Sequence, residues 1–210
     1  MPMDIKICGL RRPIDAEYIS EFEEIKYAGF VFFERSRRKV TVDEVLDIKR
    51  KLRPDIKTVG VFAEYSIDDI RDIVDRAGFD ICQLHSDETN EDCGRIQIPV
   101  WKSIAMKDSS SLEKARQYTN VQGFVLDSDS GRQRGGIGKT FDWDIAKSFS
   151  QRYFTVLAGG ISAENIISAC NIVAPDVVDL SSSVEENGYK SYERIKELIY
   201  TVRKEDRYGI

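Results

Sequence analysis

The chain has 210 residues, 41% of them hydrophobic and 32% charged, and its 31 Lys and Arg against 36 Asp and Glu leave a formal net charge of −5. This is the composition of a soluble globular protein, and the mild acidic balance argues against a protein that coats nucleic acid. With no run of about 18 apolar residues and no secretion signal at the start, we expect a cytoplasmic protein that does not span a membrane.

Short apolar segments alternate with amphipathic segments along the whole chain. The apolar segments are typical of buried parallel strands, and the amphipathic ones of helices. In chain order, the first four predicted pairs of strand and helix are 4–9 and 13–24, 28–33 and 41–53, 58–62 and 66–77, and 81–85 and 88–95. In the fifth pair, strand 100–104 precedes helix 111–118, and in the sixth, strand 123–127 precedes a helix from about 142. In the seventh, strand 153–158 precedes a helix that Ser162 caps, and in the eighth, strand 177–181 precedes helix 189–203.

Several helix boundaries have their own signals. Pro13 suits the first turn of a helix, and Thr41 with Glu44 three residues later forms a capping box. Ser66 is a suitable N-cap, and Gly78 is typical of a helix end.

Eight strand–helix units in about 200 residues, with no linker between them, predict an α/β fold: a single (β/α)8 barrel domain over residues 1–210. The alternative is an open doubly wound sheet, which usually has fewer strands.

The active site of such a barrel lies at the C-terminal ends of its strands. The predicted strands end in a thiol at Cys8, an imidazole at His85 and a carboxylate at Asp127, and the basic cluster 34–38 follows the second strand. Two small-residue loops, 159–160 and 181–183, follow the last two strands. We therefore expect all these groups at one mouth.

The two small-residue loops predict a phosphate site. Gly159 and Gly160 precede a helix, so their backbone N–H groups can point at an anion, and Ser181 and Ser182 can do the same. Loops seven and eight are the frequent phosphate site of this fold, which indicates a small phosphorylated substrate. The alternative is that the two glycines only make a tight turn.

Cys8 and Asp127 each allow two interpretations. A lone cysteine is most often a small buried hydrophobe, but Cys8 could act as a general base if a positive neighbour, Lys6 or Arg38, lowers its pKa. Asp127 either caps a loop or serves as a general acid in its protonated form, and Asp129 competes for both roles.

The remaining motifs say less about the function of the protein. The basic run 35–39 is either a solvated loop or a clamp on an anionic substrate. The segment 135–140 resembles a nucleotide-binding loop, but Gln133 stands where that motif needs Gly, so a mobile lid fits it better. One histidine, no Gly-x-Ser-x-Gly and four cysteines without Cys-x-x-Cys predict no metal centre, no serine hydrolase and four free thiols. His85 itself either lines the pocket or has a structural role.

Together these segments resemble the phosphoribosylanthranilate isomerase family. The start Lys-Ile-Cys-Gly at 6–9 and the stretch Gly-Lys-Thr-Phe-Asp-Trp at 138–143 are the more specific matches. The other matching segments, in order, are 29–32 with Ser36 and Arg38, 59–62, 83–85, 126–127, 135–136, 159–161, and 178–182 with 184–185.

The resemblance implies an Amadori rearrangement in tryptophan biosynthesis, without cofactor or metal, that converts N-(5-phosphoribosyl)anthranilate to 1-(2-carboxyphenylamino)-1-deoxyribulose 5-phosphate. It implies that Cys8 is the general base, Asp127 the general acid and Arg38 the ligand of the anthranilate carboxylate. Members of the family occur as monomers and homodimers, and either is expected here. The further expected substrate-binding residues are His85, Asp179, Gly159, Gly160, Ser181 and Ser182.

The chain departs from the usual residues of this family at Glu34, Ser86, Ile137, Ser183 and Ser191. Ser183 stands where glycine is usual, and serine fits there only if the backbone does not need a positive φ. The alternatives are a barrel that only binds a phosphorylated ligand and a sugar-phosphate isomerase of histidine biosynthesis. The latter family commonly uses a pair of aspartates, so the thiol at the first strand end argues against it.

Overall fold

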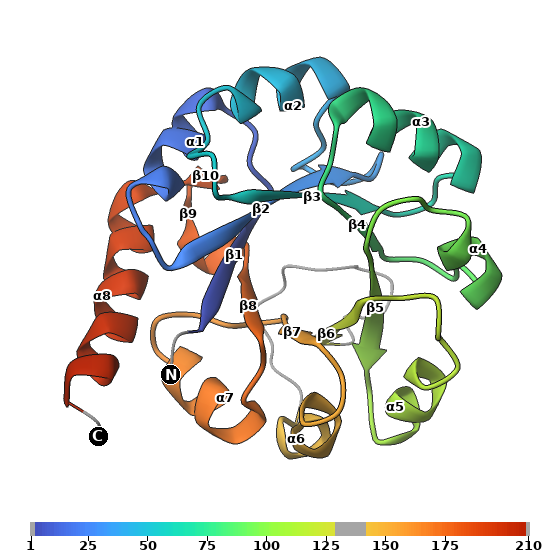
Figure 1. Ribbon diagram of the computed structural model, residues 1–210. Helices are drawn as coiled ribbons and strands as arrows, with labels where there is room; N and C mark the ends of the chain where they lie inside the picture. Colours follow the sequence, from blue (N-terminus) through green and yellow to red (C-terminus); the bar gives the residue numbers. More distant parts are fainter. Residues whose placement is uncertain (1–2, 129–141, 209–210) are drawn as a thin grey trace.

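The structure, a computed structural model, describes residues 3–128 and 142–208 and contains a closed barrel of eight parallel strands (Figure 1). Each strand pairs with the next one in the chain, and β8 closes the ring against β1, so the predicted (β/α)8 barrel is confirmed. The strands are β1 (Asp4–Cys8), β2 (Ile25–Phe32), β3 (Lys57–Phe62), β4 (Ile81–Leu84), β5 (Val100–Met106), β6 (Gly123–Ser128), β7 (Thr155–Leu157) and β8 (Val177–Leu180).

Helices surround the barrel, one after each strand (Figure 1). Among the described residues, no helix has both the length and the apolar character that a membrane crossing needs. The helices are α1 (Pro13–Ser20), α2 (Val42–Lys49), α3 (Ile67–Ala77), α4 (Asn90–Gly94), α5 (Ser110–Ala115), α6 (Asp144–Ser150), α7 (Ile166–Val173) and α8 (Tyr192–Tyr208). Between β8 and α8 lie the short 3-10 helix η1 (Ser182–Val184) and a hairpin of β9 (Glu185–Glu186) and β10 (Tyr189–Lys190).

The predicted capping signals operate as expected. Thr41 and Glu44 form a reciprocal capping box, in which each side chain accepts a hydrogen bond from the backbone N–H of the other residue. Ser66 accepts from the backbone of Asp69 at the start of α3, and Gly78 ends that helix in the left-handed conformation with φ 62°.

Several helix boundaries differ from the prediction by a few residues. Helix α1 ends at Ser20 rather than at residue 24, because β2 begins at Ile25 and the chain needs the intervening turn to reach it. Helix α7 begins at Ile166, and Ser162 instead closes the turn before it by pairing with Asn165. The last helix begins at Tyr192, since the residues before it form the hairpin β9–β10.

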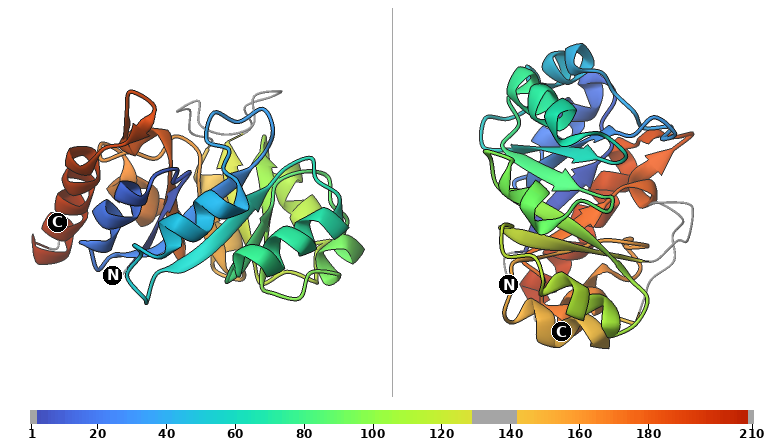
Figure 2. Two further views of the ribbon diagram at one scale, coloured as in Figure 1. Left: turned by 90° about the horizontal axis from the view of Figure 1, so that it is seen from above. Right: turned by 90° about the vertical axis from the view of Figure 1, so that its right-hand side faces the viewer.

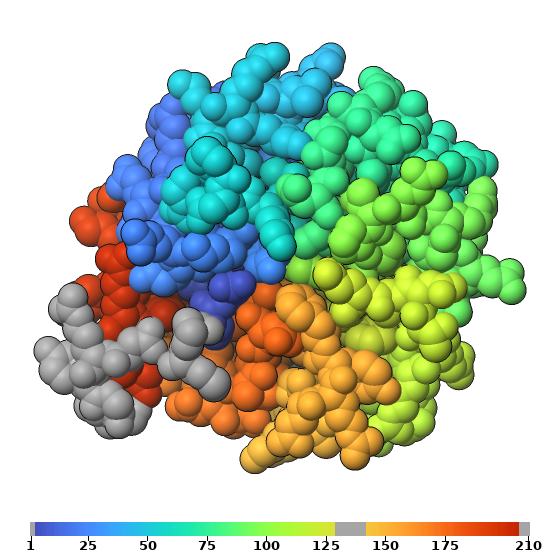
Figure 3. All heavy atoms as spheres, viewed as in Figure 1, coloured from blue at the N-terminus to red at the C-terminus, as the bar shows by residue number. Residues whose placement is uncertain are grey.

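Aromatic side chains fill the barrel at the N-terminal ends of its strands. The ring of Trp101 lies 5.1 Å from that of Tyr27 and 5.6 Å from that of Phe154, between ring centroids. Trp101 is fully buried, and aliphatic side chains of other strands pack around this group. In the space-filling view, side chains fill the centre of the ring (Figure 3). The barrel is therefore a packed core, and space for a ligand remains at the opposite end of its strands.

Candidate active site

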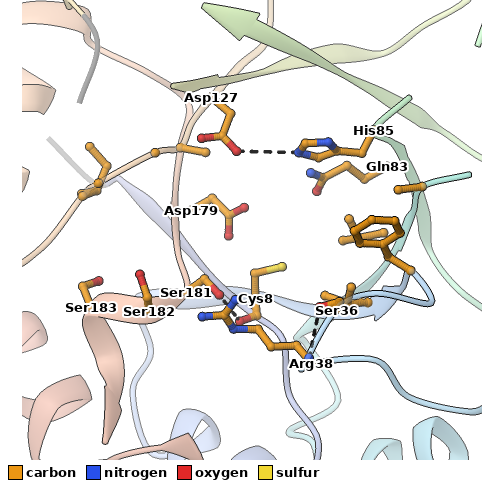
Figure 4. A pocket seen from close by; sticks show the side chains of 18 residues that line it. Cys8, Ser36, Arg38, Gln83, His85, Asp127, Asp179, Ser181, Ser182 and Ser183 are labelled. Atoms are coloured by element: carbon orange, nitrogen blue, oxygen red, sulfur yellow. Dashed lines mark hydrogen bonds and ion pairs between the residues drawn. The ribbon is translucent and has the colours of Figure 1, made fainter. Parts of the chain in front are cut away.

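A cavity of about 840 Å³, counting its part open to solvent, lies at the C-terminal ends of the strands. Its lining comes from seven of the eight strands or from the loops that directly follow them, and Figure 4 shows the side chains converging on it. The cavity brings together every site residue predicted from the sequence: Cys8, Arg38, His85, Asp127, Gly159, Gly160, Asp179, Ser181 and Ser182.

Cys8 ends β1 and is 8% exposed at the cavity wall. Two residues earlier on the same strand, the buried Nζ of Lys6 lies 2.8 Å from Oδ2 of Asp179 on β8. Burial raises the pKa of the Cys8 thiol, while the ammonium groups of Lys6 and Lys190 lower it and Asp179 raises it. The net shift is upward, so the pKa of Cys8 is raised and not lowered as the base role was expected to need.

Asp127 and His85 face each other across the upper part of the cavity in Figure 4. Asp127 Oδ2 lies 3.6 Å from Nε2 of His85, too far for a strong hydrogen bond and near enough for a charged pair. On the other side, a Cβ on Gly159 would come within 2.6 Å of Asp127 Oδ1, and Gly159 has φ 83°. Only glycine therefore leaves the room that this carboxyl group occupies.

The two loops predicted to bind phosphate both border the cavity. Gly159 and Gly160 take positive φ values of 83° and 70°, which turn the backbone after β7 sharply. After β8, Ser181 donates from Oγ to the carbonyl oxygen of Cys8 at 3.1 Å. Ser183 lies in the 3-10 helix η1 and is not among the residues with positive φ, so serine replaces the usual glycine here without backbone strain.

Four buried polar atoms of the cavity wall have no hydrogen-bond partner among the described residues: Gln83 Oε1, Asp127 Oδ1, Asp179 Oδ1 and Ser183 Oγ. Buried polar groups in native proteins are nearly always paired, so unpaired ones at one site call for a partner. The oxygens of Gln83 and Asp179 suit a ligand with hydroxyl or N–H groups, and the carboxyl group of Asp127 can accept a hydrogen bond when ionised or donate one when protonated.

The basic run after β2 is divided between the cavity and the surface. Arg38 lines the cavity, and its Nε and Nη2 donate to the two carboxylate oxygens of Glu185 at 2.6 and 2.9 Å. Arg35 pairs with Glu64 and Lys39 with Glu34 on the exposed face. The expectation that the whole cluster 34–38 faces the mouth is therefore wrong for Glu34, Arg35 and Arg37, which do not line the cavity.

Glu185 and Lys190 contact residues of the site but were not predicted as parts of it, whereas Lys6 was expected as a possible positive neighbour of Cys8 and does act on its thiol. Lys6 and Cys8 share a face of β1, because side chains two residues apart on a strand point to the same side. Glu185 and Lys190 follow the last barrel strand, and their roles depend on contacts with distant residues.

Three of the departures from the usual family residues have local explanations. Ser86 accepts a hydrogen bond from the backbone of Glu64 at 2.9 Å, and Glu34 pairs with Lys39. The Oγ of Ser191, just before α8, donates to Oε2 of Glu186 at 3.4 Å. Asp129, Ile137 and the predicted lid 135–140 lie outside the described residues.

The cavity thus offers a thiol, a carboxyl group beside an imidazole, a guanidinium group and two loops suited to an anion. Within residues 3–128 and 142–208, no three His, Cys, Asp or Glu side chains are grouped so that they could hold a metal ion. The chemistry that these groups can perform is proton donation to one part of a bound anion and proton removal from another.

Comparison with known proteins identifies the relatives of this barrel. A family model described as N-(5'-phosphoribosyl)anthranilate (PRA) isomerase matches residues 5–201. The N-(5'-phosphoribosyl)anthranilate isomerase of a Thermoanaerobacter species is 40% identical over 200 residues, covering 95% of this chain and 97% of that protein. The crystal structure of phosphoribosyl anthranilate isomerase from Thermotoga maritima is similar with a TM-score of 0.88 and 32% identity, over 96% of this chain and 99% of the other. A second structure, of phosphoribosyl anthranilate isomerase with reduced 1-(o-carboxyphenylamino)-1-deoxyribulose 5-phosphate, has a TM-score of 0.85 and 30% identity, with the same coverage of both chains.

Proposed function

Because the chain belongs to the N-(5'-phosphoribosyl)anthranilate isomerase family, we propose that it converts N-(5'-phosphoribosyl)anthranilate to 1-(2-carboxyphenylamino)-1-deoxyribulose 5-phosphate, a step of tryptophan biosynthesis. The observation that carries the proposal is the cavity at the strand ends, where Cys8, Asp127 and Arg38 converge with the two loops suited to phosphate. The proposed substrate carries groups that match this cavity: a carboxylate, sugar hydroxyls and a phosphate.

Asp127 is the general acid in this proposal. Its protonated carboxyl group donates to the furanose ring oxygen while the bond from that oxygen to C1 breaks, and the anthranilate nitrogen supplies the electron pair that forms the iminium. The position suits this step, because Asp127 Oδ1 is buried without a partner among the described residues and is free to face a ligand atom. His85, 3.6 Å away, supports the carboxylate that remains after the transfer.

Cys8 is the general base. Its thiolate removes the proton from C2 of the iminium, which leaves an enolamine that tautomerises to the ketone product. Burial makes the thiolate costly to form, and the buried ammonium groups of Lys6 and Lys190 offset part of that cost. A thiolate formed in this environment is a strong base, because a raised pKa means a high affinity for the proton it removes.

The ends of the substrate are held by groups that do not react. Arg38 binds the anthranilate carboxylate, since a guanidinium presents paired donors that match a planar carboxylate. The phosphate lies against Gly159, Gly160, Ser181 and Ser182, whose backbone N–H groups and hydroxyls border one part of the cavity. His85 and Asp179 line the space between these two ends.

The test is a turnover assay with N-(5'-phosphoribosyl)anthranilate made in place, followed by the fall in anthranilate-type fluorescence. We expect turnover by the wild type and a loss of about 10²-fold or more in kcat for both Cys8→Ser and Asp127→Asn. Cys82→Ser is the matched control, because Cys82 is also a buried cysteine in a barrel strand but does not line the cavity. No wild-type turnover, with retained binding of a phosphorylated ligand, would instead indicate a barrel that only binds. Equal losses in Cys8→Ser and Cys82→Ser would remove Cys8 from the base role.

A further inference from the structure

We propose that Glu185 is a positioning residue for substrate recognition: it holds the guanidinium of Arg38 in the orientation that receives the substrate carboxylate. The inference rests on the proposed function, because it assigns how one end of the same substrate is bound. Glu185 does not line the cavity, so it acts through Arg38 and not by touching the ligand.

The contact between the two side chains is bidentate and sheltered from water. Arg38 uses Nε and Nη2 to bind both carboxylate oxygens of Glu185, so Nη1 is the nitrogen that Glu185 leaves unengaged. The side chains are only 11% and 4% exposed. A fork-to-fork contact fixes the plane of the guanidinium as well as its position, and the plane decides which edge a second carboxylate can meet.

Glu185 is itself held on two further sides. Arg37 donates to Oε2 at 2.8 Å from the exposed side, and the buried Lys190 donates to Oε1 at 2.9 Å. Lys190 also donates to the carbonyl oxygen of Ser181 at 3.0 Å. The carboxylate therefore sits among three cationic groups, and the loop after β8 is tied to it through Lys190.

The hairpin β9–β10 makes this arrangement possible. Glu185 begins β9 and Lys190 ends β10, and the two residues are paired in the register of the hairpin. Seen from the side, the hairpin and the loop after β2 rise from the same end of the barrel (Figure 2, left). The hairpin thus joins the loop that carries Arg38 to the loop expected to bind phosphate, which sets the distance between the two ends of the ligand.

Gly9 restrains Arg38 from another side. A Cβ added to Gly9 would lie 2.5 Å from Cδ of Arg38, so the aliphatic part of the arginine packs directly on the glycine backbone. With its stem against Gly9 and its guanidinium against Glu185, Arg38 has one arrangement before the substrate arrives. Ordering a long side chain costs conformational entropy, which opposes binding. Because Arg38 is already ordered, this cost does not weaken the binding of the substrate.

The experiment measures KM and kcat for N-(5'-phosphoribosyl)anthranilate in Glu185→Gln. We expect KM to rise roughly tenfold or more while kcat changes much less, because a misplaced clamp weakens binding of a group remote from the reacting atoms. Glu186→Gln is the matched control: it removes the same charge from the next residue of β9, which is exposed, and its KM should stay near the wild-type value.

A second arm separates positioning from a merely structural role. In an Arg38→Ala background, Glu185→Gln should raise KM no further, because the residue through which it acts is gone. If Glu185→Gln does not fold, Glu185→Asp takes its place, since it keeps the charge beside Lys190 but is too short to hold Arg38. An unchanged KM in Glu185→Gln, or an equal rise with and without Arg38, would overturn the proposal. Absence of wild-type turnover would instead count against the proposed function.

Discussion

Lys6 and Asp179 stand opposite each other on β1 and β8, the two strands that close the barrel, and Nζ of Lys6 lies 2.8 Å from Oδ2 of Asp179. Lys6 is fully buried and Asp179 lines the cavity, and the two act on the Cys8 thiol with opposite signs. Burial raises the pKa of Asp179, and Lys6 lowers it. The pair therefore sets how readily the thiol loses its proton.

Asp179→Asn should lower the pKa of Cys8, because it removes a negative charge that raises this pKa and frees Lys6 to face the thiol. Lys6→Met should raise it. The measurement is the rate of Cys8 alkylation by iodoacetamide against pH, in a background where the other three cysteines are serine. Removing one partner of a buried pair also costs on the order of 3–5 kcal/mol, which urea unfolding would detect. Shifts of the same sign in both variants would contradict this interpretation.

Gly159→Ala should lower kcat at least about tenfold, because the new Cβ would lie 2.5 Å from the backbone nitrogen of Ser128 and 2.6 Å from Oδ1 of Asp127. Gly188→Ala is the matched control. Gly188 has a similar φ of 80° but nothing within 4 Å of an added Cβ. Both variants should lose about 1–2 kcal/mol of unfolding free energy to the left-handed backbone, and Gly159→Ala should lose more because of its close contacts. If the two variants lose kcat equally, the carboxyl group of Asp127 is not what Gly159 accommodates.

The protein should lose stability in acid through Glu185. Burial raises the pKa of this carboxyl group, but Arg38 and Lys190 outweigh it and lower the pKa from 4.5 to about 2. With the folded pKa below the unfolded one, the stabilisation is complete above about pH 4.5 and is lost as pH falls towards 2. The check is the difference in unfolding free energy between the wild type and Glu185→Gln, which should shrink below pH 4.5. A difference that stays constant down to pH 2 would speak against the shift.

Lys102→Met should destabilise the protein by roughly 3–5 kcal/mol, because it leaves Glu88 charged and buried. Lys102 Nζ lies 3.0 Å from Glu88 and donates to the carbonyl oxygen of Ser86 at 2.6 Å, in the loop that follows His85. Lys26→Met breaks an exposed pair with Asp55 and should cost about 0–1 kcal/mol. Chemical unfolding of both variants tests the contrast, and similar costs would mean that burial of the Lys102 pair carries no extra penalty.

The barrel could be predicted from the sequence because its signals are local. Apolar runs that end in small or polar residues, and caps such as those of α2 and α3, depend on neighbours within a few positions. The hairpin β9–β10 was missed although Asn187 and Gly188, with φ 51° and 80°, are the residue pair typical of a two-residue hairpin turn. Its strands have two residues each, too few for alternation to show.

Part of the site could be predicted from the rule that the active site of a barrel lies at the C-terminal ends of its strands. That rule selects Cys8 and Asp127, but it cannot separate Arg37 from Arg38, which differ only in which way they turn from the loop. Glu185 lies 147 positions from Arg38 along the chain, and no local pattern connects them. The direction of the Cys8 pKa shift could likewise not be predicted from the sequence, because it depends on burial that only the closed barrel creates.

The closure of the barrel also fixes when the thiol at the end of β1 obtains its surroundings. Lys6 and Asp179 are separated by 173 positions, so the ribosome must make nearly the whole barrel before their pair can form. Until β8 is released and docks beside β1, Cys8 is an ordinary thiol on a growing chain, open to oxidants and without its buried neighbours. The residue proposed as the base is thus among the first to be synthesised and among the last to be protected.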